Sequence, residues 1–165
     1  DGVKYGNGWR YMTEHYYQED LFDLPAQIRV TERELELWDR GLARLRPLEG
    51  DIPEAKRGIA RRQIGLAEFL AHAVRTMNNV RRFLLEGTTL ASDAVSQDKR
   101  QEAGARMRAI LADEAANVRE TIPLVVADSS LGWEPTMGYV CNRMMLEWKL
   151  SQLKETEKRL AAKLQ

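Results

Sequence analysis

A long helical pattern between Pro53 and Glu86 constrains the fold of this chain more than any other stretch. Apolar side chains recur in it at steps of three and four residues, as they do along one face of an α-helix. They are Leu66, Leu70, Ala73, Met77, Val80 and Leu84. Further apolar residues widen this face past half of the circumference, which is typical of a helix with neighbours on more than one side. We therefore expect a central helix in an all-α domain, with the residues from Leu66 to Leu84 in its core.

Three more segments have apolar residues at the same helical spacing. They run from Thr31 to Pro47, from about Ser96 to Pro123, and from Thr136 to near Gln165. Thr31 and Glu34 form a capping-box pattern at the start of the first segment. Short loops place consecutive helices side by side in opposite directions. The sequence thus predicts an all-α fold, a bundle of about four long antiparallel helices that occupies residues 31–165.

Residues 1–30 are expected to precede this bundle as an irregular aromatic segment and connector. Gly2, Gly6 and Gly8 favour an irregular start, and the residues from Trp9 to Glu19 are compatible with a short helix. Aromatic clusters of this kind either cover the edge of a core or stack against a sugar, a base or another protein. We favour the packing role for this segment.

The composition argues against several classes of function. The 165 residues include 25 basic and 25 acidic side chains, a balance unlike that of nucleic-acid-binding proteins. No apolar run reaches the roughly 18 residues of a membrane span. No signal peptide is visible, which favours the cytoplasm. The first residue, Asp1, is not a methionine, so we expect a processed form or a piece of a longer protein.

Residue chemistry also argues against a metal or cofactor site. The two histidines are His15 and His72, and neither follows a glutamate by three residues, as the ligands of a metal site in a helical bundle do. The single cysteine, Cys141, cannot form an intrachain disulfide and is expected to be a structural thiol. Phosphate-binding loops, nucleophile elbows and zinc-protease helices are absent from the sequence. We therefore expect no metal, no cofactor and no catalytic residue in this chain.

A candidate binding site joins the polar side of the central helix to the loop that follows Pro123. Its residues are Arg75, Asn79, Arg82, Asp128, Ser129, Trp133 and Glu134. A guanidinium group binds a carboxylate through two parallel hydrogen bonds, so we expect Arg75 or Arg82 to hold this loop through one of its two acids. A polar ligand such as a sugar acid is the alternative occupant. We favour an internal salt bridge, or a solvated face, over ligand binding.

Several short stretches resemble a known group of proteins. They are Trp38 with Gly41-Leu42, Arg75-Thr76, Asn79-Val80, Arg82-Phe83, Ile122 to Val125, Ala127 to Ser129, Leu131 to Met137, and Glu147 to Lys149. Together they are similar to the helical C-terminal region of large, mostly uncharacterised bacterial proteins that look like glycoside hydrolases. The resemblance covers most of the chain from Thr31 to Leu153, and it departs from the family pattern at Val126 and Ser130.

The resemblance implies a non-catalytic accessory module whose partner is an upstream catalytic domain of the same polypeptide. Such a module would brace that domain or complete its substrate cleft, with carbohydrate as a further partner. The alternative is a stand-alone helical interaction protein, or a homodimer that associates through exposed apolar stripes. A third hypothesis is a small enzyme that uses Arg75, Arg82 and Asp128, which requires these side chains to meet in a concave pocket.

Overall fold

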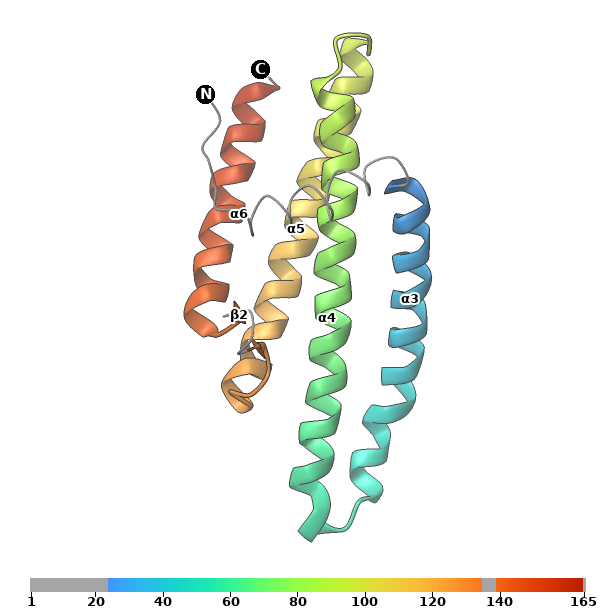
Figure 1. The fold of residues 1–165 in the computed structure, drawn as a ribbon, viewed down its shortest axis with the longest axis vertical. Helices are drawn as coiled ribbons and strands as arrows, with labels where there is room; N and C mark the ends of the chain where they lie inside the picture. The colour runs from blue at the N-terminus through green and yellow to red at the C-terminus, as the bar shows by residue number, and fades with distance from the viewer. Residues whose placement is uncertain (1–23, 135–138, 165) are drawn as a thin grey trace.

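Four long helices dominate the structure, a computed structural model that describes residues 24–134 and 139–164. They are α3 (Leu24–Leu45), α4 (Glu54–Ala91), α5 (Gln97–Ala127) and α6 (Arg143–Lys163), and the 3-10 helix η2 (Arg46–Asp51) joins the first two. The short strands β1 (Trp133–Glu134) and β2 (Tyr139–Val140) pair in antiparallel fashion before α6. Consecutive helices run in opposite directions (Figure 1). The predicted all-α fold with about four long antiparallel helices is confirmed.

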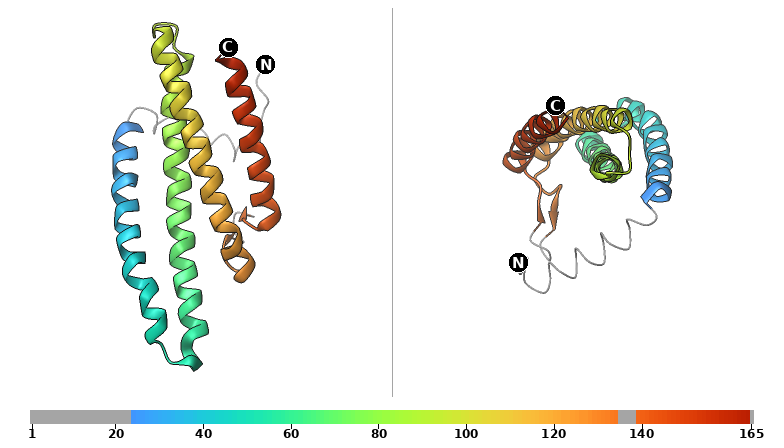
Figure 2. Two further views of the ribbon diagram at one scale, coloured as in Figure 1. Left: turned by 180° about the vertical axis from the view of Figure 1, so that it is seen from behind. Right: turned by 90° about the horizontal axis from the view of Figure 1, so that it is seen from above.

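The helices form a curved array in which each packs against the next along the chain (Figure 2). Helix α4 lies on the inner side of the curve, between α3 and α5, and α6 packs against α5. The segment from Pro53 to Glu86 is therefore central in position, as its apolar pattern predicts. At 38 residues, α4 is also longer than any of the other described helices.

Helix α3 begins at Leu24, so the expected start at Thr31 is wrong. Pro25 looks like a helix breaker in the sequence, but a proline in the first turn loses no intrahelical hydrogen bond. Thr31 is buried inside the helix rather than capping it. Its Oγ1 lies 2.8 Å from the Gln27 carbonyl oxygen and 2.9 Å from Asn78 Oδ1 of α4. The hydroxyl that suggested a cap thus serves the contact between α3 and α4.

Two further helix ends differ from the expectation. Helix α4 continues through Gly87 to Ala91, whereas α5 continues through Pro123 to Ala127, which is one of the two outcomes that a proline at this position allows. Helix α6 begins at Arg143, where Asn142 Oδ1 accepts a hydrogen bond from the Met145 amide at 3.0 Å. The expected cap at Thr136 lies outside the described residues.

Among the described residues, α5 contributes more buried side chains than any other helix, α4 included. Met107 and Leu111 pack with Leu90 and Leu160 in one apolar cluster, and Val118 and Val125 pack with Leu131 and Leu146 in a second. The predicted core stripe of α4 is wrong. Leu66, Leu70, Met77, Val80 and Leu84 remain 38% to 45% exposed. Two polar side chains of α4 are buried instead, Asn78 against Thr31 of α3 and Asn79 against Glu114 of α5.

Candidate functional site

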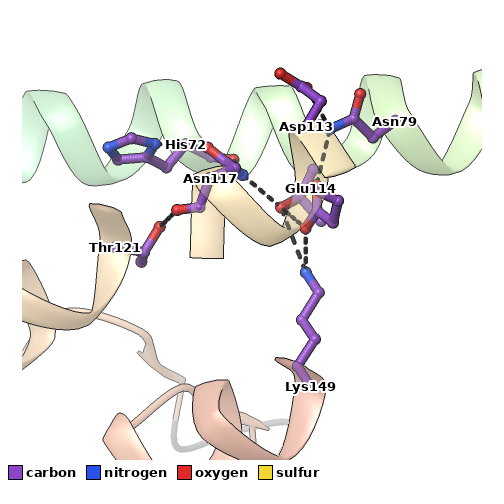
Figure 3. Close-up of polar contacts among 8 residues, drawn as sticks. His72, Asn79, Asp113, Glu114, Asn117, Thr121 and Lys149 are labelled. Atoms are coloured by element: carbon purple, nitrogen blue, oxygen red, sulfur yellow. Dashed lines mark hydrogen bonds and ion pairs between the residues drawn. The ribbon is translucent and has the colours of Figure 1, made fainter. Parts of the chain in front are cut away.

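The side of α4 that faces α5 carries a chain of hydrogen-bonded polar side chains (Figure 3). Asn117 of α5 donates from Nδ2 to the His72 carbonyl oxygen and to Thr76 Oγ1, both at 3.0 Å. A backbone carbonyl only accepts hydrogen bonds, which sets the orientation of the Asn117 amide. Asn117 Oδ1 then accepts from His72 Nδ1 at 2.6 Å. The proton of a neutral His72 therefore resides on Nδ1.

Glu114 is the charged centre of this polar network and is 5% exposed. Its carboxylate accepts from Thr76 Oγ1 at 2.7 Å and from Asn79 Nδ2 at 2.9 Å, and it forms an ion pair with Lys149 of α6. Asn79 Nδ2 also donates to Asp113 Oδ2 at 2.8 Å. A buried carboxylate is tolerated only where it is paired and hydrogen-bonded. The network satisfies this condition and joins α4, α5 and α6 at one point.

The residues of this network follow a signal that periodicity could have shown. Polar residues recur at helical spacing at positions 72, 76 and 79 of α4 and at positions 114, 117 and 121 of α5. Two such stripes pack against each other when their donors and acceptors match. Asn79 was instead expected on the polar side of α4, in a salt-bridged or solvated face, because the pattern of one helix does not show the matching residues of the next.

A different side of α4 carries the apolar face, which we define as Leu66, Leu70, Ala73, Met77, Val80 and Leu84. All six residues are exposed. On α6, Met144, Met145 and Trp148 are exposed as well. Exposed apolar residues on separate elements are ordinary when they are scattered, but those of α4 follow one stripe over about five turns of helix.

A groove between α4 and α6 adjoins the apolar face. One hollow of about 310 Å³ is lined by side chains of α4 and α6 that include Phe69, Ala73 and Trp148. A second hollow of about 220 Å³ is lined by Val80, Leu84 and Leu153 among others. Lys149 lines both hollows, so its ion pair with Glu114 lies between them. The groove is thus apolar along most of its length and charged at its middle.

A separate hollow, which we call the charged cleft, lies where η2, α4 and the end of α5 meet. It has a volume of about 540 Å³. Three salt bridges line it. Arg46 Nε pairs with Glu68 Oε1 at 2.7 Å, Arg61 Nε with Glu49 Oε1 at 2.6 Å, and Arg62 Nε with Asp128 Oδ2 at 3.0 Å. At about 100° per residue, Arg61 and Glu68 lie on the opposite side of α4 from Leu66.

The loop after α5 is held at this cleft by Asp128. The hydroxyl of Ser130 donates to Asp128 Oδ1 at 2.6 Å, and the Ser130 amide donates to the same oxygen at 3.0 Å. These two bonds, followed by the bond from Arg62, hold the pKa of the Asp128 carboxyl below its usual value. The charged form of Asp128 is therefore stabilised both by Ser130 in its own turn and by Arg62 of α4.

The predicted site residues are divided among different places. Asp128 does pair with an arginine of α4, but this arginine is Arg62, so the expected pairing of Asp128 with Arg75 or Arg82 is wrong. The same pairing through Glu134, whose side chain lies outside the described residues, stays a prediction. Arg75 Nη2 lies 3.9 Å from Asp39 Oδ1 of α3, and Arg82 is exposed. Asn79 belongs to the buried network. The three side chains required by the enzyme hypothesis, Arg75, Arg82 and Asp128, do not meet in one pocket among those of the described residues.

The rest of the predicted site lies in or beside the β hairpin. Ser129 is exposed. Trp133 and Glu134 form β1, where they pair through the backbone with Val140 and Tyr139, and their side chains lie outside the described part of the chain. Cys141, a free thiol, is half-buried and packs against the second apolar cluster. Arg46, Arg61 and Arg62 were not among the predicted site residues, because tertiary packing brings them together and places Arg62 against Asp128 of the loop.

Within residues 24–134 and 139–164, no group of three histidine, cysteine or acidic residues has the arrangement of a metal site, and none of the helices has the length and apolar character needed to cross a bilayer. Comparisons of the chain with protein-family models, with curated proteins and with solved structures found no match.

Proposed function

We propose that this chain is a non-catalytic helical docking module that packs the apolar face of α4 against the surface of another protein. The observation that carries the proposal is the exposure of Leu66, Leu70, Met77, Val80 and Leu84, which are 38% to 45% exposed on one stripe. A contiguous exposed apolar surface marks an interaction site. Its removal from water supplies a binding free energy of about 25 cal/mol per Å².

The buried network has a structural part in this proposal. Glu114 and Lys149 join α5 to α6, while Thr76 and Asn79 join α4 to the same carboxylate. Buried polar groups that satisfy one another specify one arrangement of the elements that carry them. The apolar face is therefore held in one shape, and a preformed surface loses less conformational entropy on docking.

The resemblance to glycoside-hydrolase-like proteins suggests a particular partner. In this form of the proposal, the chain is an accessory module of a bacterial carbohydrate-active protein, and its apolar face packs against the upstream catalytic domain. The full reading frame tests this form, because we expect it to encode a catalytic barrel ahead of Asp1. A reading frame without such a domain would remove the link to carbohydrates and leave a docking module or a homodimer.

The docking surface itself is tested by placing charges on it. We expect the double variant Leu70→Lys, Val80→Lys to keep the helical circular dichroism of the parent chain, because both side chains already contact water. Binding of a hydrophobic dye and self-association in sedimentation velocity should decrease sharply. Val126→Lys is the matched control, since Val126 is an exposed apolar residue of α5 that lies off the apolar face.

Two outcomes would contradict the proposal. One is a parent chain that binds no dye and stays monomeric over a wide range of concentration. The other is a double variant that unfolds, which would show that Leu70 and Val80 belong to the core of the chain. A dimer that the double variant dissociates would identify a second copy as the docking partner.

A further inference from the structure

The charged cleft has hydrogen-bonding capacity that its own salt bridges do not use. Arg46, Arg61 and Arg62 each pair through Nε alone. A guanidinium group has five N–H donors. Among the described residues, none accepts a hydrogen bond from the terminal nitrogens of these three arginines, so those donors are free to bind a ligand. Glu49 and Glu68 likewise each use one carboxylate oxygen and keep the other as an acceptor.

We propose that the charged cleft binds an uncharged ligand with several hydroxyl groups, such as a sugar or another polyol. Each hydroxyl both donates and accepts hydrogen bonds. A ring that carries hydroxyls on adjacent carbons therefore offers acceptors to the guanidinium groups and donors to the carboxylates around its whole edge. The cleft volume of about 540 Å³ lies within the range of about 300 to 1,000 Å³ for small-molecule sites.

The sign and placement of the charges argue against other small ligands. The side chains of Glu49, Glu68 and Asp128 are 34%, 21% and 16% exposed, whereas those of the three arginines are 57% to 68% exposed. The acids thus lie deeper than the arginines and would repel an anion that enters the cleft. The arginines at the opening would repel a cation. A zwitterion carries its charges on two groups only, whereas the free donors and acceptors are spread around the wall of the cleft. A zwitterion would therefore leave most of them without a partner.

The remaining lining of the cleft fits the same class of ligand. Ile64, Leu124 and Leu131 supply apolar surface beside the charged groups, and a sugar ring presents C–H groups as well as hydroxyls. Pockets that combine apolar walls with a few placed polar groups are typical of ligand sites. Gly65 also lines the cleft, and a β-carbon there would lie 4.0 Å from Leu124 Cδ2, an ordinary contact.

The experiment is a titration of the whole chain, labelled with 15N, followed through its backbone amide signals. The probes are the neutral disaccharides maltose, cellobiose and lactose, with glycine as the zwitterion and inorganic phosphate as the anion. We expect at least one disaccharide to shift the amide signals of residues 61–68 and 124–131 in a saturable manner. Glycine and phosphate should leave these signals unchanged.

Variants of the cleft identify the groups that bind. Loss of a charge-assisted hydrogen bond weakens binding by about tenfold or more, so Arg61→Ala and Arg62→Ala should each raise the dissociation constant of the disaccharide by at least that factor. Both residues are exposed, so the fold should persist. Arg106→Ala is the matched control, because Arg106 Nε also pairs with a glutamate, Glu86 Oε1 at 2.8 Å, but away from the cleft.

Each result decides for or against the polyol site. Saturable shifts that Arg61→Ala and Arg62→Ala weaken, and Arg106→Ala does not, would support it. It would be overturned by the absence of shifts with every disaccharide, by shifts that the cleft variants leave intact, or by tighter binding of phosphate or glycine. The test is independent of the docking proposal through Arg61→Ala, because Arg61 lies on the opposite side of α4 from Leu66, whereas Arg62 lies one turn before Leu66.

Discussion

Two faces of α4 reverse the usual relation between polarity and burial. The face toward α5 is polar, and Asn79 is 2% exposed there. The apolar face looks outward, and Val80, the next residue in the chain, is 45% exposed. Asn79 is buried because Glu114 and Asp113 accept its two amide hydrogens. A matched partner thus decides whether a polar side chain is buried, whereas the apolar stripe stays exposed because none of the described helices covers it.

The charged centre of the polar face gives the largest expected effect. Glu114→Ala should lower the free energy of unfolding by about 3 kcal/mol or more, because Thr76 and Asn79 lose a shared buried acceptor and Lys149 loses its ion-pair partner. The double variant Glu114→Leu, Lys149→Met should recover much of this loss, since apolar side chains of similar size replace both charges. Urea denaturation followed by circular dichroism measures both changes.

A small effect of Glu114→Ala would contradict the view that the polar face of α4 is buried. A loss below about 1 kcal/mol is typical of a solvent-exposed pair, and it would mean that water reaches the carboxylate. The polar face would then be a solvated surface, as its composition alone suggests.

Matched truncations of leucine compare the apolar face with the core. Leu111→Ala in α5 should lower the free energy of unfolding by about 2 to 5 kcal/mol, because Leu111 is 7% exposed and its loss leaves a cavity. Leu70→Ala should cost about 1 kcal/mol or less, as surface substitutions do, because Leu70 is 42% exposed. Thermal or urea denaturation of the two variants measures the difference.

Equal losses in these two variants would have a definite meaning. Leu70 would then be covered in solution, either by a second copy or by a part of the chain beyond the described residues. Repeating the Leu70→Ala measurement at several protein concentrations separates these cases, because only cover by a second copy depends on concentration.

The helices were predictable from the sequence because their signal is local. Apolar residues at helical spacing predicted all four, and three of those in α5, Met107, Leu111 and Val118, are buried. The ends of the helices were less predictable. Pro25 and Pro123 both suggested helix boundaries, yet the first lies in an opening turn and the second lies within α5.

The burial of the α4 faces could not be read from α4 alone. Its apolar stripe specifies a helix but does not specify a neighbour. The neighbour, α5, presents Glu114 and Asn117 to polar residues of α4, and its apolar residues Met107 and Leu111 pack with Leu90, which lies outside the stripe. The arginine of the loop contact was missed for a related reason. Arg62, Arg75 and Arg82 have equivalent chemistry, and only the angle between α4 and the end of α5 brings Arg62 to Asp128.

The smallest expected effect concerns this loop contact, and it depends on pH. The pKa of Asp128 is lowered in the folded chain, first by Ser130 and then by Arg62. A lowered pKa means that Asp128 contributes stability above its unfolded pKa, which is about 3.9, and that this contribution is lost as the pH falls through the folded value. Asp128→Asn should therefore lower the urea midpoint slightly at pH 7 and leave it unchanged in acid.

Two variants separate the effect of the Ser130 turn on the pKa of Asp128 from the effect of the Arg62 salt bridge. Ser130→Ala removes the largest cause of the lowered pKa, and Arg62→Ala removes the bond to α4. We expect the carboxyl carbon of Asp128, followed by NMR, to titrate at a higher pH in both, with the larger rise in Ser130→Ala. A larger rise in Arg62→Ala would show that the charge of Asp128 serves mainly to hold the loop on α4. The charged cleft would then depend on that bridge for its shape, whereas the apolar face would not.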